Sequence, residues 1–326
     1  MIGKFFNALK MLLIWQICNV LFFLSLFILI GILGVALGPA VDPLNDQHNI
    51  INEGASTSDE YILQIPMTGI IMKHEKQSVF DETVGPYERI VADLKVAEED
   101  DNVRAVLIVV NSPGGSVSVC DRLHQIIVDF KEKTKIPVYA YYESVAASGG
   151  VYTTVSSDYI MAAPTCVTGS IGVIMGGINV IDLMDKIGVK EQTYKSGAHK
   201  DMGSGSREST AEEKKLIQGI VDQLFARFVD IIIEGRKEKV VRENIVNLKG
   251  AFFLPTRALE NGLIDEIGSY EQIVKKIRVD LDDKFDVISY MQKPEWEKIF
   301  DVFGTLVPKK IRQRIELQGP LYLFEI

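Results

Sequence analysis

The sequence predicts an α/β fold with a mainly parallel sheet and flanking helices, preceded by one transmembrane helix. Between residues 60 and 162, short apolar runs that fit buried strands alternate with segments of helical periodicity. This strand–helix alternation is typical of parallel sheets with right-handed crossovers. A separate observation, an uncharged apolar run near the N-terminus, predicts the transmembrane helix.

The uncharged run covers residues 11–41, and about 20 apolar residues suffice to cross a bilayer. It is longer than the apolar core of a secretory signal, which has about 7–15 residues. Lys4 and Lys10 precede the run and Asp42 follows it, so the positive-inside rule places the N-terminus in the cytoplasm. We therefore expect a single-pass protein of the cell membrane, inner or plasma, with the remaining chain outside the cytoplasm. The alternative is a signal peptide that is removed.

The sequence divides into five expected segments. They are a cytoplasmic N-terminus (1–10), a transmembrane signal anchor (11–38), a polar linker (39–59), the main folded domain (60–285) and a C-terminal tail (286–326) without clear predicted order.

Charge and cysteine content exclude several classes of protein. The chain of 326 residues has a net charge of −9, and because Lys4 and Lys10 give residues 1–41 a charge of +2, the rest carries −11. This charge argues against nucleic acid as a partner. Cys120 and Cys166 lie among apolar and small residues, so we expect buried free thiols; one disulfide between them is the alternative. The four histidines show no metal-ligand spacing, so no metal site is expected.

The folded domain reads as a series of strands and helices. Strands are expected at 61–72 (an edge strand), 105–110, 137–142 and 159–162, and helices at 85–98, 117–133, 147–155 and 211–234, the last capped by Thr210. The strand at 105–110 is an unbroken apolar run, which indicates burial on both faces. Functional loops of such sheets gather beyond the carboxyl ends of the strands, so the turns at 113–115 and at Ser148 should share one edge.

Ser148 lies in the stretch Val-Ala-Ala-Ser-Gly-Gly at 145–150. Its small neighbours would let a substrate backbone approach closely, but a serine nucleophile needs a base. The backbone N–H groups of Gly115 and Gly149 are candidate donors to a developing oxyanion. The alternative interpretation is that Ser148 is merely a small residue at a tight helix–strand contact.

Lys200 follows Ser148 by 52 residues and is the candidate base. A lysine can serve as a base when desolvation favours the neutral amine, so we expect Asp201 to point away from it. Ser170 could orient the amine, or could simply be a turn serine. His199 is a rival base, although neighbours in an extended segment face opposite ways. On composition alone, Lys200 also fits a solvated lysine in a flexible loop.

Several ordered motifs identify a resemblance that covers roughly residues 60–280. They are Asn-Ser-Pro-Gly-Gly-Ser at 111–116, Val-Ala-Ala-Ser-Gly-Gly at 145–150, Thr-Gly-Ser-Ile-Gly-Val at 168–173, Tyr-Lys-Ser-Gly-Ala-His-Lys-Asp-Met-Gly-Ser at 194–204 and Ala-x-x-x-Gly-Leu-Ile-Asp at 258–265. The chain resembles signal peptide peptidase A (protease IV), a family of serine–lysine peptidases with a crotonase-like or Clp-protease-like fold. It resembles the short form of the family, with a single half that carries both serine and lysine.

The resemblance implies a role for each candidate residue. Ser148 is the implied nucleophile, Lys200 the general base and Ser170 the partner that orients the lysine. Gly115 and Gly149 are the implied oxyanion hole, and no cofactor is implied. The implied function is a membrane-anchored serine endopeptidase that hydrolyses cleaved signal peptides and other apolar or unfolded chains through an acyl-enzyme.

Two further expectations concern assembly and departures from the family. We expect a ring-shaped homo-oligomer, for which eight protomers is one size considered, with Ser148 and Lys200 supplied by neighbouring protomers. Leu254-Pro255 stands where the family usually has a Thr-Gly turn, and the tail after residue 286 has no family signature. The rival functions are a catalytically inactive anchored scaffold and a crotonase-like acyl-CoA enzyme.

Overall fold

The computed structural model describes residues 15, 16, 19, 22, 48–52, 54, 59–74 and 85–290. Most of the expected anchor (11–38) and linker (39–59), and the tail from 291, lie outside the described residues. No helix in the described part of the chain is long and apolar enough to cross a bilayer. The stretches His48–Gln77 and Thr83–Tyr290 form one compact unit, which contains the sheet and the helices packed on it.

Within the described residues, nine strands form one sheet. They are β1 (His48–Asn52), β2 (Tyr61–Thr68), β3 (Val103–Ser112), β4 (Val138–Ala147), β5 (Tyr159–Ala162), β6 (Val167–Gly169), β7 (Phe252–Phe253), β8 (Glu266–Ile267) and β9 (Asp286–Tyr290). The main order is β1-β9-β2-β3-β4-β5-β8, and β6 pairs with the end of β4 and with β7. Only the β1–β9 and β6–β7 pairs in this described sheet are antiparallel, which confirms the prediction of a mainly parallel sheet.

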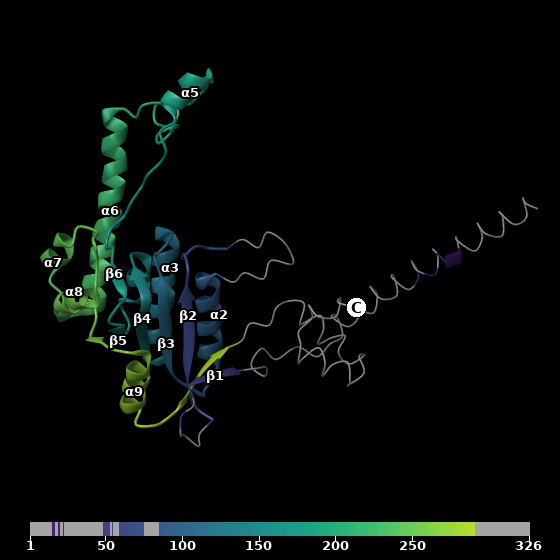
Figure 1. Ribbon diagram of the computed structural model, residues 1–326, viewed down its shortest axis with the longest axis vertical. Helices are drawn as coiled ribbons and strands as arrows, with labels where there is room; N and C mark the ends of the chain where they lie inside the picture. The colour runs from purple at the N-terminus through teal and green to yellow at the C-terminus, as the bar shows by residue number, and fades with distance from the viewer. Residues whose placement is uncertain are drawn as a thin grey trace, which may run out of the picture. The chain divides into compact units, whose positions relative to one another are not determined.

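Helices cover both faces of the sheet (Figure 1). They are α2 (Pro86–Glu99), α3 (Val117–Thr134), α4 (Gly149–Thr154), α5 (Ile181–Ile187), α6 (Ala211–Arg236), α7 (Arg242–Asn247), α8 (Pro255–Glu260) and α9 (Tyr270–Asp280), with a 3₁₀ turn at Lys237–Lys239. Successive residues of β3 face opposite sides: Ile108 packs in the core that includes α2, α3 and the end of α6, whereas Leu107 packs in the core that includes α9. The expected strand buried on both faces is therefore present.

Two local predictions were wrong. β2 is not an edge strand, because it pairs with β3 along its length and with β9 at Tyr61–Leu63. Its second neighbour is β9, more than 200 residues away in the sequence, where no order was predicted. The expected helix at 147–155 begins too early, because β4 continues to Ala147 and α4 begins only at Gly149.

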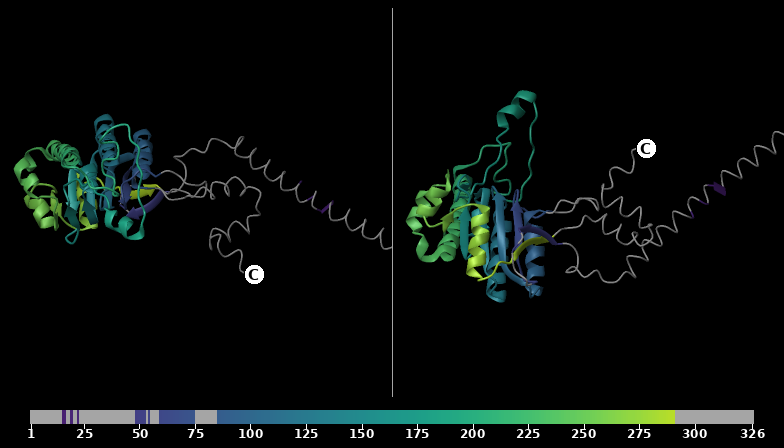
Figure 2. Two further views of the ribbon diagram at one scale, coloured as in Figure 1. Left: turned by 90° about the horizontal axis from the view of Figure 1, so that it is seen from above. Right: turned by 60° about the horizontal axis from the view of Figure 1, so that its bottom comes forward.

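One part of the domain extends away from the sheet, and we call residues 174–222 the arm. Figures 1 and 2 show α5 and the N-terminal half of α6 beyond the edge of the sheet. The buried apolar residues of α6 lie in its last third, from Phe228 to Ile232, where the helix joins the core. Thr210 caps α6 as predicted: its side chain accepts from Glu213 N–H, and the Glu213 carboxylate accepts from Thr210 N–H. α6 thus connects the arm to the core as one helix of 26 residues.

Candidate active site

Ser148 occupies the junction between β4 and α4 in a strained backbone conformation. Its φ is 51° and its ψ is −115°, in a region that residues with a Cβ rarely adopt. Two hydrogen bonds hold it there: Ser148 N–H donates to Gly169 O, and Tyr152 N–H donates to Ser148 O, each at 2.9 Å. Although Ser148 is the N-cap of α4, its hydroxyl makes no capping bond. Strain of this kind gathers at functional sites, and here it leaves the hydroxyl uncommitted to the helix.

The turn at 113–115 lies directly against the start of α4. A Cβ on Gly114 would lie 2.6 Å from Gly149 N, and a Cβ on Gly149 would lie 3.1 Å from Gly115 N. Gly149 is the first residue of α4, so its N–H has no acceptor within the helix. Ile71 bonds to both neighbours of Gly115, accepting from Ser116 N–H at 2.8 Å and donating to Gly114 O at 2.9 Å. Two neighbouring N–H groups beside a strained serine are an arrangement that can stabilise an oxyanion.

A small pocket opens beside Ser148. It contains about 290 Å³ of space, part of it open to solvent, and is lined by Gly115, Val117, Cys120, Ser148, Gly149, Tyr152, Gly172, Val173, Leu224 and Phe228. Its walls come from the 113–115 turn, α3, α4, the segment just before the arm and α6. Because most of these side chains are apolar, the pocket suits an apolar group next to the serine hydroxyl.

The cysteine in this pocket is not a second nucleophile. Cys120 is buried, and burial raises the pKa of its thiol to about 12, so it is protonated at neutral pH. Cys120 and Cys166 are both free, which confirms the expected buried thiols. Within the described residues there is also no cluster of three or more histidine, cysteine or acidic side chains that could hold a metal ion.

Ser170 reaches the same edge of the sheet as Ser148. β6 runs parallel to β4 with Ala147 opposite Gly169, so Ser148 and Ser170 each follow a paired residue. Ser170 also has a positive φ, of 50°, and its N–H donates to Ala251 O at 2.8 Å. The structure thus brings Ser148, Gly149, Gly115 and Ser170 together at the carboxyl ends of the strands.

Lys200 lies elsewhere, on an exposed turn of the arm. The neighbouring His199 lies 3.9 Å from Glu213, in the first turn of α6. Leu224, on the wall of the Ser148 pocket, follows Glu213 by 11 residues, which is about 16 Å along a helix. Within this single chain, the structure therefore does not bring Lys200 or the rival base His199 to Ser148.

Three pocket residues, Tyr152, Leu224 and Phe228, were not singled out from the sequence. Leu224 and Phe228 belong to the apolar stripe of α6, which predicts core packing. Where α6 meets α4, the same stripe closes the pocket, and the rings of Tyr152 and Phe228 lie 4.8 Å apart between centroids. Tyr152 follows Ser148 by one helical turn, and that spacing could have indicated it.

The chain is similar to a family of peptidases and to several proteins named as peptidases. Residues 130–283 match the model of peptidase family S49. A candidate signal peptide peptidase SppA of Enterococcus faecium is 36% identical over 230 residues, which cover 70% of this chain and 65% of that protein. A candidate protease of Methanocaldococcus jannaschii is 35% identical over 191 residues, covering 59% of this chain and 60% of that protein.

A further relative, protease 4 of Haemophilus influenzae, is 28% identical over 218 residues, covering 66% of this chain and 35% of that protein. The matched region therefore spans less than two thirds of the length of each of these three curated relatives. The resemblance expected from the motifs is confirmed. The S49 match at residues 130–283 and the relatives named signal peptide peptidase SppA and protease 4 support assigning this chain to peptidase family S49.

Proposed function

We propose that this protein is a serine endopeptidase in which Ser148 is the nucleophile and Lys200 is the general base. The observation that carries the proposal is the strained Ser148, whose hydroxyl does not cap α4 and whose neighbour Gly149 packs against Gly115. The match of residues 130–283 to peptidase family S49 supports peptide-bond hydrolysis. We assign the domain to the crotonase-like or Clp-protease-like group of folds on the same grounds.

The proposed reaction has two halves. The hydroxyl oxygen of Ser148 attacks the peptide carbonyl carbon while its proton passes to the neutral amine of Lys200. The oxyanion of the tetrahedral intermediate accepts hydrogen bonds from Gly115 and Gly149. When the C–N bond breaks, Lys200 returns the proton to the leaving amine and Ser148 holds the acyl group. A water molecule, deprotonated by the same lysine, then attacks the ester and releases the acid, and Ser170 orients the amine throughout.

Lys200 is proposed to act on the Ser148 of a neighbouring protomer. This follows from its place on the arm, about 16 Å along α6 from the pocket wall. The arm also exposes large apolar side chains, among them Ile174 at 96%, Ile178 at 81% and Tyr194 at 86%. An exposed apolar surface of this kind is typical of an interaction site. A ring-shaped homo-oligomer, for example of eight protomers, would bury the arm and complete the site.

The proposed substrates are cleaved signal peptides and other apolar or unfolded chains. The apolar walls of the Ser148 pocket support this choice, as does the name of the relative from Enterococcus faecium. We further propose that residues 11–38 anchor the protein in the cell membrane, with the peptidase domain on the extracytoplasmic side; the uncharged run and its flanking charges support this.

The test is hydrolysis of a fluorogenic apolar peptide by the full-length protein in detergent. Wild type is compared with Ser148→Ala and Lys200→Ala, and with two matched controls, Ser118→Ala beside the site and Lys190→Ala on the arm. Both residues of the controls are exposed. We expect both dyad variants to lose nearly all activity and both controls to keep it, and only proteins with intact Ser148 to react with a fluorophosphonate. Activity retained by Ser148→Ala would refute the assignment of Ser148 as the nucleophile. An assembled wild-type protein that does not react with the fluorophosphonate would favour an inactive scaffold.

A further inference from the structure

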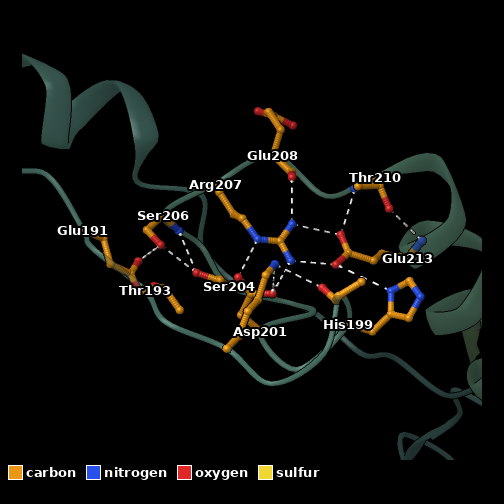
Figure 3. Close-up of polar contacts among 12 residues, drawn as sticks. Glu191, Thr193, His199, Asp201, Ser204, Ser206, Arg207, Glu208, Thr210 and Glu213 are labelled. Atoms are coloured by element: carbon orange, nitrogen blue, oxygen red, sulfur yellow. Dashed lines mark hydrogen bonds and ion pairs between the residues drawn. The ribbon is translucent and has the colours of Figure 1, made fainter.

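The guanidinium of Arg207 lies between two carboxylates on the arm, as Figure 3 shows. Its Nε donates to Asp201 Oδ2 at 2.8 Å and its Nη2 to Asp201 Oδ1 at 2.6 Å. Its Nη1 donates to Glu213 Oε2 at 2.9 Å and its Nη2 to Glu213 Oε1 at 2.6 Å. Both contacts are bidentate, a geometry that suits the planar fork of arginine and that lysine cannot reproduce.

The two carboxylates belong to different parts of the arm. Asp201 is the neighbour of Lys200 on the exposed turn, whose backbone is closed by the bond from Lys200 N–H to Gly197 O at 3.2 Å. Glu213 is part of the capping box of α6, and its side chain is only 1% exposed. Arg207 therefore connects the turn that carries Lys200 to a helix whose second half contributes Leu224 and Phe228 to the wall of the Ser148 pocket.

The same contacts neutralise the negative charge of Asp201. Lys195 Nζ also donates to Asp201 Oδ1, at 2.8 Å, so two cations other than Lys200 share this carboxylate. Arg207 and then Lys195 hold the pKa of Asp201 well below its usual range, and Arg207 lowers the pKa of Glu213 to about 2. Both acids are thus ionised at neutral pH. A carboxylate released beside a lysine would favour the protonated form of its amine, which is useless as a base.

We propose that Arg207 is a positioning residue for Lys200. Its guanidinium joins the Lys200 turn to the first turn of α6, and it holds the Asp201 carboxylate away from the Lys200 amine. This inference rests on the proposed function, in which Lys200 is the general base. Other charged or titratable groups near this turn come from the arm and the first turn of α6: Glu191, Lys195, His199, Glu208 and Glu212.

Replacing Arg207 by glutamine should have two separate effects. The turn loses its attachment to α6, so kcat should fall about tenfold or more, with KM within about twofold, because small misplacements of a catalytic group are costly. The released Asp201 carboxylate should also shift the acid limb of the kcat/KM–pH profile upward by about one pH unit. In the double variant Arg207→Gln/Asp201→Asn, the acid limb should return toward its wild-type position while kcat stays low. Arg207→Lys keeps the charge without the fork, so its kcat should lie between those of wild type and Arg207→Gln.

The experiment measures kcat, KM and the pH profile of the full-length protein in detergent, with assembly and thermal unfolding checked for every variant. Arg242→Gln is the matched control, because it removes an arginine from the exposed ion pair with Asp230. A wild-type kcat and acid limb in Arg207→Gln would overturn the inference. If that variant fails to assemble, wild-type values in Arg207→Lys would overturn it instead. Full activity in Lys200→Ala would refute the proposed function itself, whatever the Arg207 variants do.

Discussion

The N–H of Ser148 donates a hydrogen bond to the carbonyl oxygen of Gly169 at 2.9 Å. This bond continues the parallel pairing of β4 with β6 by one step beyond the last paired residues, Ala147 and Gly169. It holds Ser148 at a φ of 51°, so the ends of two strands maintain the strain at the proposed nucleophile. The chain then enters Ser170 and the arm, and the pairing that fixes the serine also sets where the arm begins.

Gly149 is packed so closely that a methyl group should disturb both stability and catalysis. A Cβ at this position would lie 2.4 Å from Cys120 Sγ, a buried atom that has little room to move. We expect Gly149→Ala to lower the free energy of unfolding by about 1–3 kcal/mol and to reduce kcat, because it displaces an N–H of the proposed oxyanion hole. Thermal unfolding and peptide hydrolysis measure the two effects.

The source of the Gly149 effect can be tested with a second substitution. Cys120→Ala removes the sulfur atom, so the double variant Cys120→Ala/Gly149→Ala should regain part of the lost stability. Gly219→Ala in α6 is the control, since a Cβ there meets no atom within 4 Å; we expect it to stabilise the protein by roughly 0.5–1 kcal/mol. A double variant no more stable than Gly149→Ala would show that contact with Cys120 is not the cause.

Asp265 should be a structural residue, and its loss should cost more than the loss of its exposed partner. Its Oδ1 accepts from Arg236 Nη2 at 2.7 Å and from Lys239 Nζ at 2.6 Å, and its Oδ2 accepts from Ile160 N–H at 2.8 Å. The Arg236 side chain is buried, whereas that of Lys239 is half exposed. Asp265→Asn leaves a buried guanidinium without its counter-charge, so we expect a loss of about 3 kcal/mol in unfolding free energy.

Lys239→Gln is the matched control for Asp265, with an expected loss below about 1 kcal/mol because exposed ion pairs contribute little. Equal losses in the two variants, measured by unfolding at one pH, would contradict the role assigned to the Arg236–Asp265 pair.

His124 should make the folded domain less stable in mild acid. It is buried on α3 with its ring edge-on to Tyr152, and its Nδ1 makes no hydrogen bond among the described residues. Burial lowers its pKa, so between its folded value and the unfolded value of about 6.5 the unfolded chain binds more protons. The free energy of unfolding therefore falls as the pH drops below about 6.5, with a limiting slope near 1.4 kcal/mol per pH unit.

The His124 contribution can be isolated by comparing unfolding midpoints at pH 7.5, 6.5 and 5.5. His124→Phe should show a shallower decline than wild type, whereas the exposed control His199→Gln should follow the wild-type curve. Asp93, whose pKa burial raises to about 6, acts in the opposite direction but is present in all three proteins. An unchanged slope in His124→Phe would contradict this prediction.

The sequence predicted those parts of the fold that depend on local patterns. The apolar run of β3 and the periodicity of α3 and α6 are local, and all three elements form near the expected positions. The pairing of β2 with β9 joins segments more than 200 residues apart, and β9 has only five residues, so no local pattern indicates it. Because Pro66 lies in β2 and Gly69 follows it, this segment taken alone resembles an edge strand, where proline is tolerated.

The candidate site was likewise predicted only where its residues form a local sequence pattern. Small residues around Ser148 and the glycine turn at 113–115 are visible in the sequence, and the structure places them side by side. The contact between Arg207 and Asp201 was not foreseen, because the two residues are six positions apart in a segment without periodicity. No local pattern in the sequence indicates that Lys200 lies on a projecting arm, because its position depends on the path of α6.

Mixing two inactive proteins tests most directly whether Ser148 and Lys200 act together across two protomers, as we propose. Ser148→Ala and Lys200→Ala proteins are unfolded or dissociated together, reassembled at equal amounts and assayed with the fluorogenic peptide. We predict about a quarter of wild-type activity, because in a head-to-tail ring about one interface in four then receives both intact groups. Assemblies verified to contain both variants, yet no more active than either parent, would contradict a dyad shared between protomers.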